Sequence, residues 1–277
     1  MYLAIPLLLG VAVALVFLGR LYVRQNALIF RPGPMLNRSP ADYGIAYEDV
    51  RLPCAGGRDV RGWWIPAAEG RPVVIFFHGS DGNITHELPV ACFLSALSVG
   101  VLLVEYPGYG DGGRTSERGT YEAADAAWAF ATGARGVRPD QIIIFGQSLG
   151  SAVAIYLAAR HACAGLVVHS GFTSVPDLAA RAFPYLPVRP FCRTRMNSLE
   201  RIAGCGGPVL VLHSEDDEAI PVDAAKTLYA RVCGPRRLVL YRGPHHGAHW
   251  QYDLRIRQAW TELANRRTET WERPEEG

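Results

Sequence analysis

Residues 141–160, which read QIIIFGQSLGSAVAIYLAAR, constrain the fold more than any other stretch of the chain. Four bulky apolar residues at 142–145 form an unbroken run, as in a strand buried on both faces of a parallel sheet. Gly-Gln-Ser-Leu-Gly follows at 146–150, and apolar residues then recur at helical spacing. The pentapeptide alone could be a chance match, but a serine on a tight turn between a buried strand and a helix is typical of a nucleophile elbow. Its two glycines leave room for a strained backbone and an exposed Ser148 hydroxyl.

Strand and helix patterns alternate over some two hundred residues around this unit. This alternation predicts an α/β fold with a mostly parallel, doubly wound sheet and helices on both of its faces. A chain of 277 residues suits one such domain with a small appendage. The expected strands are 45–52, 60–65, 73–77, 100–105, 142–145, 166–169, 208–213 and 237–241, and the expected helices are 88–97, 121–131, 149–157 and 175–182.

The amino terminus predicts a membrane anchor. Residues 2–19 carry no charge and are dominated by Leu, Val, Ala and Ile, which is just enough length to span a bilayer as a helix. A secretory signal peptide would need a basic segment first and a small-residue cleavage site, and neither precedes Arg20; a buried core helix is the other alternative. Basic residues follow the apolar segment and none precedes it, so the positive-inside rule places the globular domain on the cytoplasmic side.

The remaining organisation follows from composition. Residues 1–24 are the expected anchor, 25–44 a connector rich in Pro and Gly near its end, 45–265 the catalytic domain and 266–277 a polar tail. A net charge of +2 gives no reason to expect nucleic acid as a partner. The six cysteines include no C-x-x-C pair, so neither a zinc cluster nor a dense disulfide framework is expected, and a bridge between Cys192 and Cys205 stays open. The oligomeric state is not predicted.

A serine nucleophile needs a base and an acid, and in a parallel sheet these lie in loops that follow strands. The expected strand 208–213 is followed by a loop dense in carboxylates, and the expected strand 237–241 by a loop with three histidines, at 245, 246 and 249. The order serine, acid, histidine is the one that this elbow uses. The histidines could instead form a metal site, but no matching acid or cysteine spacing accompanies them. The chemistry requires no metal or cofactor.

The expected reaction also needs N–H donors for the negative charge that develops on a carbonyl oxygen. One donor is predicted to be the backbone amide of Leu149, directly after the nucleophile. The other is predicted to be the amide of Ser80, in the turn after the strand 73–77. Together they would form an oxyanion hole.

Several motifs resemble those of one branch of the serine hydrolases, the BEM46-like α/β-hydrolases. They cover nearly all of residues 25–262 and specify the fold more than the substrate. The resemblance implies an α/β-hydrolase fold with a Ser-His-Asp triad. The motifs are His-Gly-Ser-Asp-Gly-Asn-Ile at 78–84, Tyr-Pro-Gly-Tyr-Gly at 106–110, Gly-Gln-Ser-Leu-Gly at 146–150, Phe-Thr-Ser at 172–174, the stretch from His213 to Pro221, and Gln-Asn-Ala-Leu-Ile-Phe-Arg-Pro at 25–32.

The resemblance also implies which residues complete the triad. It places the acid at Asp217 rather than Asp216 and the base at His246, with His245 taking the place of a glycine. The chain departs from the branch in the turn after the strand 73–77, where Ser80 replaces asparagine and Asp81 replaces alanine. The added charge of Asp81 would oppose an anionic substrate.

Residues 171–204 join two strands and are long for a connector. They are either a packed loop with one helix or a small apolar lid over Ser148, in which Phe172, Phe183 and Tyr185 would contact the substrate. The sequence thus predicts a membrane-anchored serine hydrolase that cleaves carboxylic esters or thioesters of a small-molecule or acylated substrate. A peptidase or amidase on the same triad and a non-catalytic scaffold with this fold are the alternatives.

Overall fold

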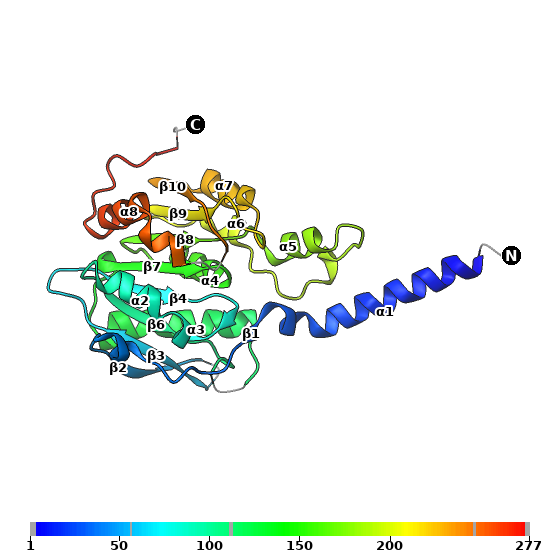
Figure 1. Cartoon of the computed structure of the whole chain (residues 1–277), viewed down its shortest axis with the longest axis horizontal. Helices are drawn as coiled ribbons and strands as arrows, with labels where there is room; N and C mark the ends of the chain where they lie inside the picture. Colours follow the sequence, from blue (N-terminus) through cyan, green and yellow to red (C-terminus); the bar gives the residue numbers. More distant parts are fainter. Residues whose placement is uncertain (1–3, 56, 111–112, 246–247, 275–277) are drawn as a thin grey trace.

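An eight-stranded sheet lies at the centre of the computed structural model, which describes residues 4–55, 57–110, 113–245 and 248–274 (Figure 1). Its strand order is β10-β9-β8-β7-β4-β6-β3-β2. The pairs β2–β3 and β3–β6 are antiparallel and the others are parallel, which confirms the predicted α/β class. The strands are β2 (Glu48–Pro53), β3 (Asp59–Ile65), β4 (Val73–Phe77), β6 (Gly100–Val104), β7 (Ile142–Gln147), β8 (Gly165–His169), β9 (Val209–Ser214) and β10 (Arg236–Tyr241).

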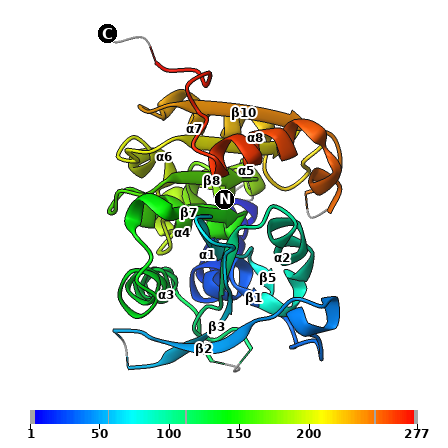
Figure 2. The ribbon, with the colours of Figure 1, turned by 90° about the vertical axis from the view of Figure 1, so that its left-hand side faces the viewer.

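Helices cover both faces of the sheet (Figure 2). Alternate residues of β4 point to opposite faces, so that Ile75 packs in the core under α3, α4 and α7, and Phe76 packs in the core under α2 and α8. Both faces of the central strands are therefore buried, which explains their unbroken apolar sequences. The helices are α1 (Ala4–Ile29), α2 (Leu88–Ser95), α3 (Glu117–Ala129), α4 (Leu149–Ala158), α5 (Val175–Ala182), α6 (Ser198–Ile202), α7 (Val222–Arg231) and α8 (Leu254–Ala264).

The predicted membrane anchor is wrong. In the part of the chain that the structure describes, no helix is both long and apolar enough to cross a membrane. Two further expectations depended on that anchor: the membrane as a partner and the cytoplasmic placement of the domain. Both are withdrawn. The apolar run belongs to a longer helix, α1, which continues through Arg20 and Arg24 to Ile29 and whose second half contacts the domain.

The expected connector and tail are both attached to the domain. β1 (Arg31–Pro32) pairs with β5 (Asp81–Gly82) in a small second sheet, which joins the chain after α1 to the turn that follows β4. In the polar tail, Trp271 is buried and the Glu272 carbonyl accepts a hydrogen bond from the Arg236 amide, so the described part of the tail packs against the domain. All six cysteines lie within the described residues and are free thiols, so Cys192 and Cys205 are not paired.

Candidate active site

Ser148 lies on a strained turn between β7 and α4. Its backbone angles are φ 51° and ψ −117°, a conformation that costs free energy in a residue with a side chain. The flanking glycines are required by contact: a Cβ on Gly146 would lie 2.0 Å from the carbonyl oxygen of Gly150, and a Cβ on Gly150 would lie 2.0 Å from that of Phe77. The sequence 146–150 can fold as the expected elbow because both flanking positions are glycine, where any side chain would collide with a backbone carbonyl.

Three side chains from separate loops form one hydrogen-bonded line. The hydroxyl oxygen of Ser148 lies 3.1 Å from Nε2 of His245, and Nδ1 of the same imidazole lies 2.5 Å from Oδ2 of Asp217. His245 follows β10 and Asp217 follows β9, so both come from the carboxyl edge of the sheet that also presents Ser148. The Asp217 side chain has no exposed surface and that of His245 is 8% exposed.

The surroundings of Asp217 favour its ionised form. Burial opposes the charge, but hydrogen bonds from His245 and from the Ile220 amide, and the nearby imidazoles of His245 and His213, outweigh burial and lower the pKa of Asp217. Its Oδ1 accepts from the amides of Ala219 and Ile220 at 2.9 and 2.8 Å. An ionised carboxylate at this place favours the Nδ1–H tautomer of the imidazole, in which Nε2 carries the lone pair.

Asp216, the alternative acid that the sequence offered, makes a different contact. Asp216 is exposed, and its carboxylate accepts a hydrogen bond from the Gly243 amide at 3.1 Å. The sequence prediction put the base at His246, which lies outside the described residues. The imidazole that the structure places between Ser148 and Asp217 is that of His245, one position earlier.

The turn after β4 lies against the nucleophile. An added Cβ on Gly79 would lie 3.6 Å from the Cβ of Ser148, and both Ser80 and Leu149, the predicted oxyanion residues, line the same cavity as Ser148. The carbonyl of Ser80 accepts hydrogen bonds from the Arg31 amide at 2.9 Å and the Tyr109 hydroxyl at 2.7 Å. The carboxylate of Asp81 pairs with the Arg31 guanidinium at 2.6 Å, which offsets the negative charge that the sequence suggested would oppose anionic substrates.

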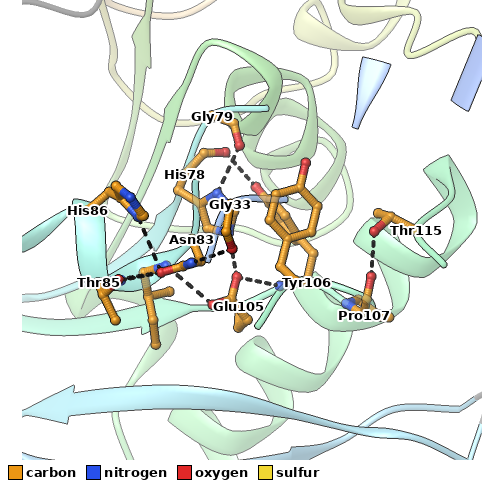
Figure 3. Close-up of polar contacts among 12 residues, drawn as sticks. Gly33, His78, Gly79, Asn83, Thr85, His86, Glu105, Tyr106, Pro107 and Thr115 are labelled. Atoms are coloured by element: carbon orange, nitrogen blue, oxygen red, sulfur yellow. Dashed lines mark hydrogen bonds and ion pairs between the residues drawn. The ribbon is translucent and has the colours of Figure 1, made fainter. Parts of the chain in front are cut away.

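A buried network supports this turn from below (Figure 3). Nε2 of His78 lies 2.8 Å from Oε1 of Glu105, and both side chains are almost fully buried. Burial disfavours the charged imidazole, but the hydrogen bond to Glu105 and the carboxylates of Glu105 and Glu87 outweigh burial and raise the pKa of His78. Glu105 also accepts from the amides of Ile84 and Tyr106, at 3.2 and 3.3 Å.

The far end of the turn is held by one asparagine (Figure 3). The amide nitrogen of Asn83 donates to the carbonyls of Gly33 and Pro34, each at 3.0 Å, and its oxygen accepts from the amide of Thr85 at 3.0 Å. Asn83 is fully buried. The motif at 78–84 is therefore a rigid support that ties the chain after α1 to the turn beside Ser148.

A cavity of about 480 Å³ opens beside Ser148 and His245 and is lined mostly by apolar side chains. Of the three predicted lid residues, Phe172 and Phe183 line it, whereas Tyr185 does not and is 97% exposed. The contribution of α1 to this cavity was not predicted; the helix supplies Leu18, Leu21, Tyr22, Gln25, Leu28 and Ile29. Their spacing of three and four residues was the available signal, but the helix had been expected to end near residue 24 and residues 25–29 to belong to a connector.

Several other aromatic side chains are structural. Trp63 and Trp64 are buried in the core on opposite faces of β3. His213 is fully buried and donates from Nε2 to the Ile220 carbonyl at 2.9 Å, next to Asp217. Among the residues that the structure describes, no group of three or more His, Cys, Asp or Glu side chains is arranged to hold a metal ion.

Comparison with known proteins places the chain in a family. Residues 72–190 match the family described as the alpha/beta hydrolase fold. An uncharacterised protein of Mycobacterium tuberculosis is 34% identical over 229 residues, which cover 82% of each chain. Protein bem46 of Schizosaccharomyces pombe is 30% identical over 250 residues, which cover 85% of this chain and 83% of bem46. The chain belongs to the BEM46-like α/β-hydrolases.

The fold of this α/β-hydrolase is also found in solved structures. The esterase Pf2001 of Pyrococcus furiosus superimposes with a TM-score of 0.68 at 22% identity, covering 87% of this chain and 99% of the esterase.

A further sequence relative comes from Arabidopsis thaliana. The alpha/beta hydrolase domain-containing protein WAV2 is 31% identical over 247 residues, which cover 80% of this chain and 79% of WAV2. Family and fold together support a hydrolase activity.

Proposed function

We propose that this α/β-hydrolase cleaves carboxylic esters, including thioesters, through an acyl-enzyme on Ser148. The observation that carries the proposal is the continuous line of hydrogen-bonding atoms from Ser148 through His245 to Asp217. A serine hydroxyl is a weak nucleophile, and it needs a base at hydrogen-bonding distance whose far nitrogen is held by a third group. The separations of 3.1 Å between Ser148 Oγ and His245 Nε2 and 2.5 Å between His245 Nδ1 and Asp217 Oδ2 support the proposal.

In the proposed mechanism, Nε2 of His245 accepts the Ser148 proton as the oxygen attacks the substrate carbonyl carbon. Negative charge moves to the carbonyl oxygen, where the amides of Leu149 and Ser80 would stabilise it. The imidazolium, paired with Asp217, then protonates the leaving alcohol or thiol as its bond to carbon breaks. Water repeats the sequence on the acyl-enzyme, so that carboxylic acid is released and the Ser148 hydroxyl is restored.

The test uses p-nitrophenyl butyrate hydrolysis and labelling by a serine-reactive fluorophosphonate. Ser148→Ala is expected to abolish labelling and to lower kcat by at least about a thousandfold. Labelling that persists in Ser148→Ala would contradict the proposal. Comparison of the ester with the matching p-nitroanilide separates an esterase from an amidase on the same residues.

A second comparison tests the assignment of the base. His245→Ala is expected to lose activity like Ser148→Ala, while His161→Ala, which removes a half-buried imidazole stacked on Trp128, keeps activity. The informative third variant is His246→Ala. If His246→Ala is inactive while His245→Ala remains active, the base is His246, as the resemblance implied, and the proposed role of His245 is refuted.

A further inference from the structure

One face of α1 lines the cavity that contains Ser148. Its lining residues fall at positions 18, 21, 22, 25, 28 and 29, spacings that place them along a single stripe of the helix. The opposite wall comes from the 171–204 insertion, which supplies Phe172, Phe183 and the apolar face of α5. The cavity is therefore lined by an amino-terminal helix and an insertion that are about 150 residues apart in the sequence.

Direct bonds hold this part of α1 against the insertion. Gln25 is buried; its Oε1 accepts from the Arg193 amide at 2.6 Å, and its Nε2 donates to the Phe191 carbonyl at 3.3 Å. The ring of Phe17 meets that of Phe183 edge-on, with centroids 5.8 Å apart. Because the Gln25 amide is bonded to the insertion, the stripe is fixed in place and its polar group is satisfied.

The direction of the groove follows from the carboxyl end of α1. The Arg31 amide bonds the Ser80 carbonyl in the turn beside Ser148, so the Ile29 end of α1 lies near the nucleophile. Leu18 precedes Ile29 by eleven residues, which is about 16 Å along a helix axis at 1.5 Å per residue. The lined path away from the nucleophile is thus far longer than an acetyl group.

We propose that the second half of α1, from Leu18 to Ile29, is one wall of an acyl-chain groove and sets the length of acyl chain that the hydrolase accepts. The inference rests on the proposed acyl-enzyme at Ser148. A fatty acyl chain suits the groove because it is apolar along its length and attached at one end to the reacting carbonyl, and burying its methylene groups is favourable. Leu21, eight residues before Ile29, lies at the part of the wall that only a longer chain reaches.

The experiment measures kcat/KM for p-nitrophenyl acetate, butyrate, octanoate and dodecanoate on the full chain. Leu21→Trp narrows the distal groove, and the ratio of kcat/KM for dodecanoate over butyrate is expected to fall by at least about tenfold, since each excluded methylene loses its burial. Val23→Trp is the matched control: Val23 is on the same helix but on the side opposite to the stripe, is 73% exposed and does not line the cavity, so its ratio is expected to match that of the unsubstituted chain. Ile29→Trp, nearer the nucleophile, is expected to exclude octanoate as well.

The outcomes separate this inference from the proposed function. If the unsubstituted chain hydrolyses none of the esters and Ser148 is not labelled, the proposed function fails. If the chain hydrolyses butyrate but Leu21→Trp leaves the dodecanoate-to-butyrate ratio unchanged, or Val23→Trp lowers it equally, the role of α1 is refuted while the hydrolase proposal stands. Should Leu21→Trp not fold, Leu21→Ala widens the same place, and an unchanged chain-length profile for that variant refutes the role of α1 in its turn.

Discussion

Glu105→Leu tests whether the buried network beneath the oxyanion turn holds the turn in place. The change removes the carboxylate that pairs with His78 and leaves the imidazole and the amides of Ile84 and Tyr106 without their acceptor. Breaking a buried pair by removing one partner costs about 3–5 kcal/mol. The two amide bonds are long, at 3.2 and 3.3 Å, and add about 1 kcal/mol each at most. We expect a loss of about 5 kcal/mol in the free energy of unfolding, or a drop of 10 °C or more in Tm.

The assay is thermal unfolding, read together with fluorophosphonate labelling of Ser148. The matched control is Glu122→Leu, which breaks a surface pair with Arg118, whose side chain is 86% exposed, and is expected to change the free energy of unfolding by less than about 1 kcal/mol. Equal Tm values for the Glu105 and Glu122 variants would refute the reasoning. At temperatures below the Tm of Glu105→Leu, where the variant is folded, labelling of Ser148 is expected to be weaker than in the unsubstituted chain. The reason is that the turn beside Ser148 loses its support.

The sign of the pH dependence gives a second check on the same pair. The pKa of His78 is raised above its ordinary value of 6.5, so the charged imidazole stabilises the fold fully below pH 6.5 and this contribution is lost as the pH rises through the raised folded-state pKa. Glu105→Gln keeps an acceptor but removes the charge. The destabilisation caused by Glu105→Gln is therefore expected to be largest below pH 6.5 and to shrink at alkaline pH; a pH-independent difference would contradict a charged pair.

Three further predictions concern the site. Gly146→Ala places a Cβ 2.0 Å from the Gly150 carbonyl and is expected to cost about 3 kcal/mol or more in urea unfolding, whereas Gly133→Ala, with no atom within 4 Å of the added carbon, is expected to be nearly neutral. Asp217→Asn is expected to lower kcat by up to about 10⁴-fold. The folded-state pKa of Asp217 lies below its ordinary value of 3.8, so the ionised carboxylate stabilises the fold above pH 3.8. The difference in free energy of unfolding between the unsubstituted chain and Asp217→Asn should therefore shrink as the pH falls through the folded-state pKa. Gln25→Ala is expected to cost about 1–2 kcal/mol and to speed hydrogen exchange in residues 18–29, which mass spectrometry would detect.

The sheet was predictable because each of its central strands is buried on both faces and so has an unmistakable apolar sequence. The predicted strand 73–77 and helix 175–182 agree with β4 and α5 to the residue. The helices that the sequence does not predict include α6, α7 and α8. The sequences of α7 and α8 mix polar and apolar residues, although Leu228 and Trp260 are fully buried in their inner faces. The two-residue strands β1 and β5 depend on a contact between segments 50 residues apart, which no local pattern encodes.

The site was predictable to the extent that chemistry restricts it. The strand–turn–helix unit predicts Ser148 as the nucleophile, and a motif predicts Asp217 rather than Asp216 as the acid; in the structure the Asp217 carboxylate accepts hydrogen bonds from the amides of Ala219 and Ile220. The histidine loop contains two adjacent imidazoles, at 245 and 246, and the position of the His245 imidazole depends on the backbone path after β10. A motif aligned by spacing could not fix that path to one residue.

The amino-terminal helix shows how one sequence pattern supported a wrong conclusion. Hydropathy averaged over residues 2–19 describes how apolar a helix is but not which side of it contacts protein. The stripe from Leu18 to Ile29 crosses the charged positions Arg20 and Arg24, which do not line the Ser148 cavity. A helix with charges on one side and a fixed apolar stripe on the other is suited to cover a groove. What matters in this segment is therefore which side of the helix faces the domain. That orientation depends on the contacts between α1 and the 171–204 insertion, which are far apart in the sequence.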